Sequence, residues 1–357
     1  MLSPPSSPRS LPREASGPTP ESDPWRIEPL AGWHLALLGD PAFLPLHAVL
    51  QQAVLWGVPE RLLRLITNRQ SLAPQVLVAF APHSQTVLGL VVSRRLNRSG
   101  TCWQMQHLRT TRADLRSSLS AALLREAIQR AQGATSWVAS ASSLDLGRMA
   151  MLREQGFQPL RNDHLWFWQS GCIQQDKQPS DLLLRPLNRR TAPQLWHLEQ
   201  AACPAQLRQI LDRRVEDLLD QSQSKGWMLL DPSRQEAVAA VRWLGDHAGG
   251  GHEIELTVHP GWGHLYGAPT TWLLEQIGRS LDAGAALWLR SDGRDAERQR
   301  WLHNLGAEER GERVLMARSL WRRAPLVPQN TAGRRIEAVL EQLQPRRRPA
   351  PSPLQRP

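Results

Sequence analysis

Two segments of the chain repeat one pattern of apolar and polar positions. Each begins with a leucine pair, Leu123-Leu124 or Leu273-Leu274, at the start of an amphipathic stretch. A short apolar run and an arginine-containing stretch follow, at 137–140 and 145–157 in the first copy and at 286–290 and 295–307 in the second. Gly156 lies 33 residues after Leu123, as Gly306 does after Leu273, and the pattern recurs at an offset of 150. Such matched spacing predicts two copies of one α/β unit.

Short apolar runs outside these segments complete the predicted elements of each half. Strands are expected at 25–30, 76–80, 87–93, 102–108 and 165–169, and again at 183–187, 227–230, 237–243, 253–258 and 314–320. Helical spacing of apolar residues predicts helices at 44–66 in the first half and at 192–202 and 207–219 in the second. Strands that alternate with helices favour an α/β architecture for each half.

The composition sets the domain organisation. The chain has 357 residues, of which 41% are hydrophobic, and this is enough for two domains with their own cores. Residues 1–24 are rich in Pro and Ser and lack an apolar segment, so we expect a disordered lead-in and not a signal peptide. The predicted boundaries are a first domain at 25–170, a polar linker at 171–180, a second domain at 181–323 and a basic Pro/Arg-rich tail at 324–357.

Cysteine usage and apolar runs bound the cellular setting. The three cysteines, Cys102, Cys172 and Cys203, include no close pair, which argues against a disulfide framework and favours a reducing, cytoplasmic compartment. No apolar run approaches the roughly 18 residues that a membrane span needs, so no membrane association is predicted.

The net charge of +10 raises the question of a nucleic-acid partner. Residues 323–357 contain seven arginines against Glu337 and Glu341, so half of the excess charge lies near the C-terminus. Such a tail could bind phosphate by counterion release. Lysine is nearly absent, with only Lys177 and Lys225, and this favours a general bias toward arginine over selection for phosphate binding.

Three sequence stretches resemble the GCN5-related N-acetyltransferases (GNAT). The stretch 255–260, Glu-Leu-Thr-Val-His-Pro, is similar to the end of the family's fourth strand, and 151–157 and 301–307 are similar to its late helix and the glycine that ends it. The resemblance covers about 25–170 and 181–321. It implies two tandem acyltransferase domains, each a mixed, mostly antiparallel sheet flanked by helices. It also implies acetyl-CoA as co-substrate and an amine as acceptor.

The second half carries the better candidate for a cofactor corner. A strand with one free edge can pair with the pantetheine arm, and a glycine-containing turn can hold the pyrophosphate at the N-terminus of the next helix. The resemblance implies cofactor contacts by the following residues: Thr257, Val258, Gly263, His264, Leu265, Tyr266, Gly267 and Ala268. The family signature can be placed in two registers: one begins at Gly263 and puts Tyr266 where glycine is expected, and the other begins at His264 and puts Gly267 in place but Pro269 at the last position. The corresponding turn of the first half, 110–118, contains no glycine, although Arg112 and Arg116 could neutralise a phosphate.

Acyl transfer to an amine needs a base, and the resemblance implies Glu255. Glu253 lies two residues earlier on the same strand face. The family's usual acid, a tyrosine on the late helix, is replaced by Leu152 and Leu302, and the single tyrosine is Tyr266 in the turn.

Other polar residues suggest structural roles. Asp145 and Asp295 stand where they could cap the arginine-containing helices. His252, His259 and His264 share no helical face and have no completing ligands, so no metal is predicted. Cys203 has no obvious histidine partner for nucleophilic catalysis.

Two functions from different classes remain open. One is an N-acetyltransferase with its chemistry in the second half, and its acceptor could be a small amine, an aminoglycoside, a peptide N-terminus or a lysine. The other is a catalytically inactive GNAT fold that uses its basic tail to bind nucleic acid or an acidic protein. The retained Glu255 and Gly267 favour the enzyme, and the replaced tyrosines favour the binding protein.

Overall fold

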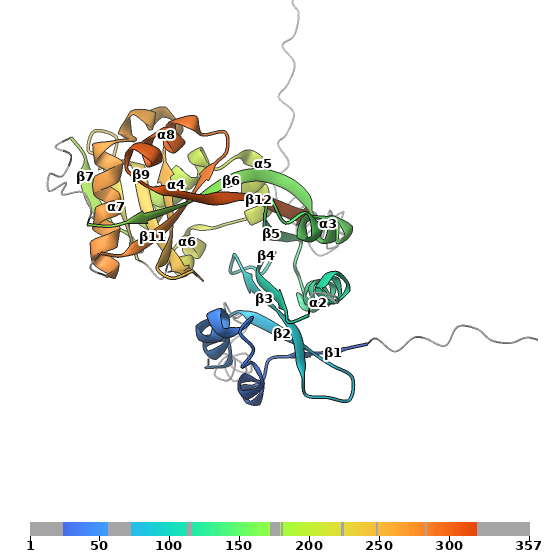
Figure 1. Ribbon diagram of the computed structural model, residues 1–357. Coiled ribbons are helices and arrows are strands. Elements are labelled where there is room, and N and C mark those ends of the chain that lie inside the picture. The colour runs from blue at the N-terminus through green and yellow to red at the C-terminus, as the bar shows by residue number, and fades with distance from the viewer. Residues whose placement is uncertain are drawn as a thin grey trace, which may run out of the picture. The chain divides into compact units, whose positions relative to one another are not determined.

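Strands from both repeats form one twelve-stranded sheet in the computed structural model (Figure 1). The structure describes residues 24–55, 73–112, 116–171, 179, 181–222, 225–247, 249–282 and 284–319. These residues all belong to a compact unit that ends at Ser319. The predicted lead-in at 1–24, apart from Pro24, and the tail at 324–357 lie outside them, as do most of the linker and residues 56–66 of the first predicted helix.

The first half follows the predicted order of strands and helices. Its elements are β1 (Arg26–Pro29), η1 (Gly32–Leu37), η2 (Leu44–Leu46), β2 (Gln75–Phe80), β3 (Val87–Arg95), β4 (Cys102–Thr110), α2 (Arg116–Arg130), β5 (Ser136–Ser142), α3 (Leu146–Glu154) and β6 (Gln158–Gln169). The five predicted strands are confirmed. The last of them, β6, begins seven residues earlier than predicted because its N-terminal part is polar and shows no apolar run.

The second half repeats this order of strands, with three helices between its first two strands. Its elements are β7 (Leu183–Pro186), α4 (Ala192–Ala202), α5 (Ala205–Leu211), α6 (Val215–Gln221), β8 (Gly226–Asp231), β9 (Glu236–Asp246), β10 (His252–Val258), η3 (Pro260–Leu265), α7 (Ala268–Leu281), β11 (Ala286–Asp292), α8 (Ala296–Asn304) and β12 (Glu308–Ser319). The prediction of a single helix at 207–219 is wrong. Two helices, α5 and α6, replace it because Asp212 adopts a left-handed conformation with φ 43°.

The two halves exchange their last strands. The strand order is β1-β2-β3-β4-β5-β12-β6-β11-β10-β9-β8-β7, so β12 of the second half pairs with β5 of the first, and β6 of the first half pairs with β11 of the second. Figure 1 shows β12 and β6 side by side at the centre of the sheet. Each domain predicted from the sequence therefore contains a last strand that pairs with strands of the other half: β6 of the first half with β11, and β12 of the second half with β5.

Each part of the sheet has helices on both faces. In the first half, α2 and α3 cover a core that includes Leu123, Leu124 and Trp137, and in the second half α7 and α8 cover the corresponding core around Leu273 and Leu274. Both repeated leucine pairs are thus fully buried. The opposite faces are covered by the segment 30–53 in the first half and by α4 and α6 in the second.

The turn between β3 and β4 joins the first half to α5 and α6 of the second. Asn97 is buried, and its Nδ2 donates to the carbonyl oxygens of Leu211 and Asp212, both at 3.1 Å. The guanidinium of Arg98 donates to both carboxylate oxygens of Asp220, at 2.5 and 2.9 Å. An apolar cluster under this turn includes α5 and β5. These contacts, together with the exchanged strands, fix the two halves against each other.

Candidate functional site

The strand β10 separates from β11 partway along its length. The two strands pair only at His252 with Leu287 and at Glu253 with Trp288. Beyond this point β10 stays paired with β9 as far as Val258, while β11 stays paired with β6. A bulge in the pairing with β9 lies at the same place, between Glu253 and Ile254. One edge of β10 at 254–258 therefore has no strand partner among the described residues, as the cofactor argument requires.

The first half has the same separation between β4 and β5. These strands pair from Cys102 with Ser136 to Met105 with Ala139, and β4 then continues against β3 as far as Thr110. A bulge again lies at the start of the separation, between Val92 and Ser93 of β3. Both copies of the repeat thus retain the opening in the sheet.

A cavity of about 810 Å³ lies between the halves, beside both openings. It is lined by residues of β3 and β4 from the first half, of α4, β10 and β11 from the second, and of both exchanged strands. Residues 253–258 of β10 line it, among them Glu253, Glu255 and Thr257. The lining is mixed, because apolar residues such as Val138 and Ile254 accompany the polar and charged ones.

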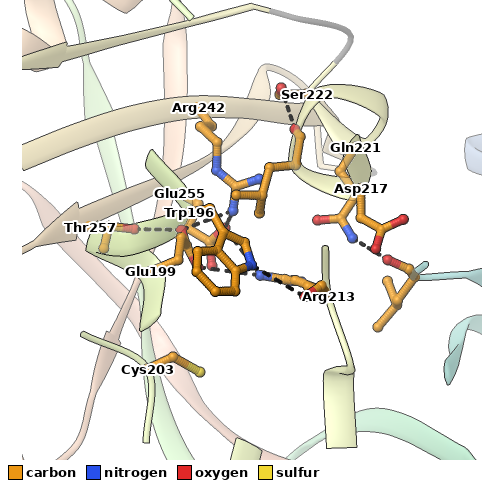
Figure 2. A network of polar contacts seen from close by, with 12 residues as sticks. Trp196, Glu199, Cys203, Arg213, Asp217, Gln221, Ser222, Arg242, Glu255 and Thr257 are labelled. Atoms are coloured by element: carbon orange, nitrogen blue, oxygen red, sulfur yellow. Dashed lines mark hydrogen bonds and ion pairs between the residues drawn. The ribbon is translucent and has the colours of Figure 1, made fainter. Parts of the chain in front are cut away.

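Glu255 belongs to a network of two carboxylates and two guanidinium groups (Figure 2). Its Oε2 accepts from Nη2 of Arg242 on β9, and the same nitrogen donates to Oε1 of Glu199 on α4 at 3.1 Å. Arg213, in the segment between α5 and α6, lies 3.5 Å from Glu199 and 4.0 Å from Glu255. The side chain of Arg242 is 1% exposed and that of Glu255 is 33% exposed, so the network extends from the interior to the cavity.

The charges of this network determine what Glu255 can do. Although burial acts in the opposite direction, Arg242 and Arg213 lower the pKa of Glu255 to about 2. Burial is the largest single effect on this carboxyl group, but the nearby guanidinium groups together outweigh it. An efficient general base has a pKa near the working pH. Glu255 is therefore ionised and suited to holding a positive group, and it is a weak proton acceptor.

The predicted cofactor residues on the strand have different surroundings. The hydroxyl of Thr257 donates to Oε1 of Glu199 at 3.0 Å, so this side chain belongs to the charge network. Val258 is buried in the apolar core on the other face of β10. Arg298 of α8 donates from Nη1 to the carbonyl oxygen of Leu256 at 3.0 Å. This bond uses a backbone acceptor of the segment that has no strand partner.

The predicted turn leads from β10 into α7 as expected. Gly267 immediately precedes the helix with φ 155° and ψ −138°, a conformation that only glycine adopts readily, and no atom lies within 4 Å of a Cβ added there. Ala268 is the exposed first residue of α7. Pro269 has no N–H, so the backbone donors of the first turn are those of Ala268 and Thr270.

The other residues of the turn are buried or contact neighbouring side chains. Leu265 is buried, and the His264 ring lies 5.2 Å from that of Trp262. The hydroxyl of Tyr266 donates to Oδ2 of Asp295 at 3.2 Å, and burial raises its pKa to about 12. A Cβ added at Gly263 would lie 2.6 Å from a carboxylate oxygen of Glu297.

Several residues have the structural roles expected of them. Asp145 and Asp295 cap α3 and α8 by accepting from the backbone N–H groups of Arg148 and Arg298, at 2.9 and 3.0 Å, which confirms the capping prediction. Leu152 and Leu302 are fully buried and offer no proton donor.

The candidate histidine ligands are engaged within the protein. Nδ1 of His259 accepts from the N–H of Gly261 at 3.1 Å, and His252 contacts the carboxylates of Asp246 and Asp282. Among the residues that the structure describes, no group of His, Cys, Asp and Glu is arranged to hold a metal ion. No helix of the same residues is long and apolar enough to cross a membrane.

Sequence reasoning missed the partners of Glu255. Glu199 and Arg242 belong to elements predicted only for their apolar residues, and Arg213 lies in a segment predicted as helix. Arg298 belongs to the repeated pattern, but the position of this residue in the repeat does not indicate that its side chain contacts the backbone of β10.

Comparison with solved structures identifies the class of fold. A GCN5-related N-acetyltransferase from Sphaerobacter thermophilus matches with a TM-score of 0.52, covering 84% of this chain and 96% of its own, at 15% sequence identity. A tandem GNAT protein from the clavulanic acid biosynthesis pathway matches with a TM-score of 0.54, covering 83% and 98%, at 14% identity. No protein-family model matches the sequence, and no curated protein matches it significantly. The chain therefore has the GCN5-related N-acetyltransferase fold in its tandem form.

Proposed function

We propose that the protein is an N-acetyltransferase that transfers an acetyl group from acetyl-CoA to an amine, with the chemistry in the second half. The observation that carries the proposal is the opening between β10 and β11 beyond Glu253. Unpaired backbone groups of β10 can form hydrogen bonds with the amides of a pantetheine arm, as an added strand does. The two free cysteines of the described chain, Cys102 and Cys203, fit the reducing, cytoplasmic setting that we propose with this activity.

The turn before α7 supports the same assignment. The conformation of Gly267 leaves open space at the N-terminus of a helix of 14 residues, where the helix dipole and the N–H groups of Ala268 and Thr270 favour an anion. The corresponding turn of the first half, 110–118, contains no glycine that would let backbone N–H groups approach a pyrophosphate closely. This difference is the reason for assigning acetyl-CoA to the second half.

Glu255 is the catalytic residue of the proposal, in a modified role. Because its pKa is about 2, we assign it to holding the acceptor's ammonium group beside the opening, with the proton leaving to water. Glu199 assists by sharing the charge of Arg242. The acceptor amine would approach through the cavity, which Glu255 lines.

A variant at the start of α7 tests acetyl-CoA binding. Ala268→Trp places a large side chain at the exposed first residue of the helix, and it should abolish the binding measured by calorimetry and the acetyl-CoA-dependent rise in melting temperature. Ser280→Trp, near the other end of the same helix and about 18 Å away, is the matched control and should bind as the unmodified protein does. No binding by the unmodified protein, or equal binding by both variants, would contradict the proposal.

Two contacts favour the alternative of a non-catalytic binding protein. Arg298 uses the carbonyl of Leu256, and the carboxylate of Glu297 approaches Gly263 in the turn. Both groups would have to move before pantetheine and a pyrophosphate could bind there. The alternative predicts that acetyl-CoA at millimolar concentration leaves the melting temperature of the protein unchanged.

A further inference from the structure

Five arginines from both halves lie in or beside the cavity, and three of them, Arg94, Arg290 and Arg313, act on the carboxylate of Glu253. This arginine cluster consists of Arg94 on β3, Arg109 on β4, Arg148 on α3, Arg290 on β11 and Arg313 on β12. All except Arg148 line the cavity, together with Glu253. Because β12 is exchanged between the halves, the cluster is assembled only when both halves are folded together.

The cluster has few partners of opposite charge. Arg290 pairs with Glu253, its Nη2 lying 2.6 Å from Oε1, and Arg94 donates to the neutral amide of Gln104 at 3.2 Å. In the described part of the chain, no carboxylate lies within ion-pair distance of Arg109, Arg148 or Arg313. The Nε atoms of Arg148 and Arg290 are inaccessible to solvent and have no hydrogen-bond partner.

The arginines repel one another. Burial, followed by the charges of Arg313 and Arg109, lowers the pKa of Arg148 to about 10, and burial and Arg290 lower that of Arg313. His107 adds no charge near neutral pH, because burial, Arg109 and Arg148 lower its pKa to about 4. The five guanidinium groups thus outnumber the carboxylates that act on Arg148 and Arg313, which are Asp145 and Glu253.

Two other arginines that line the cavity are matched by carboxylates. Arg213 lies 3.5 Å from Glu199, and Arg161 lies 2.6 Å from Asp163. Partly buried charges without partners reduce the stability of a protein, and such groups are concentrated at binding sites. The mismatch at the arginine cluster therefore points to an anion supplied from outside the chain.

We propose that the arginine cluster binds the acidic group of the acceptor, so that the acceptor is an amine carrying a phosphate or two carboxylates. This inference rests on the proposed acyl transfer. Glu253 stands at the start of the opening between β10 and β11, so the cluster is adjacent to the place where the acceptor amine must react. Val258, after which the turn to α7 begins, lies five residues further along the strand, about 17 Å away. The cluster is therefore too far from that turn to hold the pyrophosphate of the same acetyl-CoA molecule.

Calorimetry on the full-length protein tests this site with matched probes. The probes are O-phospho-L-serine against L-serine and L-glutamate against L-glutamine, each titrated at low and at physiological salt. The variants are Arg109→Gln and Arg313→Gln, which both line the cavity, with Arg125→Gln as the control because Arg125 is exposed on α2 outside the cavity. Acetyl-CoA is titrated into each protein in parallel.

The acidic probes should bind the unmodified protein and the control equally, and about tenfold more weakly to each cluster variant, the usual effect of losing one charge-assisted hydrogen bond. Acetyl-CoA affinity should not change. Without ligand the cluster variants should melt at the same temperature or higher, because a repulsive charge is removed, whereas arginines with a purely structural role would lower the melting temperature when replaced.

Equal affinity of the acidic probes for the variants and the unmodified protein would overturn the proposal. Competition between acetyl-CoA and O-phosphoserine for the cluster would also overturn it, since the anion bound there would then be a phosphate of the co-substrate. If the acidic probes bind through the cluster while acetyl-CoA does not bind at all, the acyl-transfer function fails and the anion site stands alone.

Discussion

Replacing Arg242 with methionine tests how much the charge network around Glu255 contributes to the fold. Arg242 is among the largest fully buried side chains, and it contacts both Glu199 and Glu255. Methionine is close to arginine's stem in shape, so the change removes the charge with little loss of packing. Arg234→Met, on the exposed turn after β8, is the control, because the Arg234 side chain is 68% exposed and its Nε lies 3.9 Å from Asp231.

The size of the effect follows from burial and from the pKa of Glu255. Removing one partner of a buried ion pair costs about 3–5 kcal/mol. We expect about 3 kcal/mol, because Arg242 has two further nitrogens without partners and Arg213 still faces both carboxylates after the change. The exposed control should lose less than about 0.5 kcal/mol.

The pH dependence provides a second measure. The pKa of Glu255 is about 2 in the folded protein, against an ordinary value of 4.5 for a glutamate. The contribution of this carboxylate to the free energy of unfolding is therefore fully present above pH 4.5 and is lost as the pH falls toward 2. At about 1.36 kcal/mol per pKa unit the upper limit is about 3 kcal/mol. Because a third of the side chain is exposed, screening by solvent reduces the expected contribution to about 1–2 kcal/mol.

Urea unfolding followed by tryptophan fluorescence measures these quantities, at pH 7 and at intervals down to pH 2.5. The Arg242→Met protein should be less stable at pH 7 and should lose less stability on acidification than the unmodified protein. Adding Glu255→Leu should restore part of the loss, since a carboxylate without its partner is then removed. Equal unfolding midpoints for Arg242→Met and Arg234→Met would refute the view that this network stabilises the fold.

Three further predictions concern the exchanged strands, a thiol and the opening in the sheet. A protease site inserted between Gly171 and Pro179 should yield two fragments that stay together in size-exclusion chromatography without denaturant, because each last strand pairs in the other half; separation of the fragments would contradict the exchange. Burial raises the pKa of Cys203 to about 11, so at pH 8 it should react with iodoacetamide about a hundredfold more slowly than an ordinary cysteine, and an ordinary rate would show that the thiol is not buried as described. Arg298→Ala should lower the acetyl-CoA dissociation constant about fivefold in calorimetry, because the Leu256 carbonyl is then free, whereas a higher constant would assign Arg298 to holding the co-substrate.

The repeat in the sequence was sufficient to predict the fold but not the exchange of strands. Burial of Leu123 and Leu273 depends on local helical spacing, which a sequence displays directly. The strands β6 and β12 occupy equivalent places in the two copies, so their patterns are compatible with pairing in either half. Long-range contacts distinguish the alternatives, such as the hydrogen bond at 2.9 Å from the indole of Trp166 to the hydroxyl of Ser291. The two residues are 125 positions apart in the sequence, and no pattern along the chain indicates that they are in contact.

The candidate site could be predicted only in part from the sequence, for a related reason. Glu255 could be found because it lies inside a sequence that resembles a known strand. Its chemistry depends on Arg242, which lies 13 residues earlier on a neighbouring strand, and on Glu199, which lies on the helix α4 that packs against this face of the sheet. Strand register and helix packing bring these charges together, and neither can be read from spacing along the chain. The sequence therefore indicated a base, whereas the structure indicates an anchor for positive charge.

The asymmetry between the two halves can be followed at one repeated residue. Arg148 and Arg298 stand at the same position after a capping aspartate, which accepts the backbone N–H of each. Arg298 finds a backbone acceptor on β10, so its charge is partly satisfied within the half that we assign to acetyl-CoA. Arg148 instead meets Arg109 and Arg313 in the cluster that we assign to the acidic group of the acceptor. One duplicated arginine thus has two environments, one beside the proposed acetyl-CoA and the other beside the proposed acceptor.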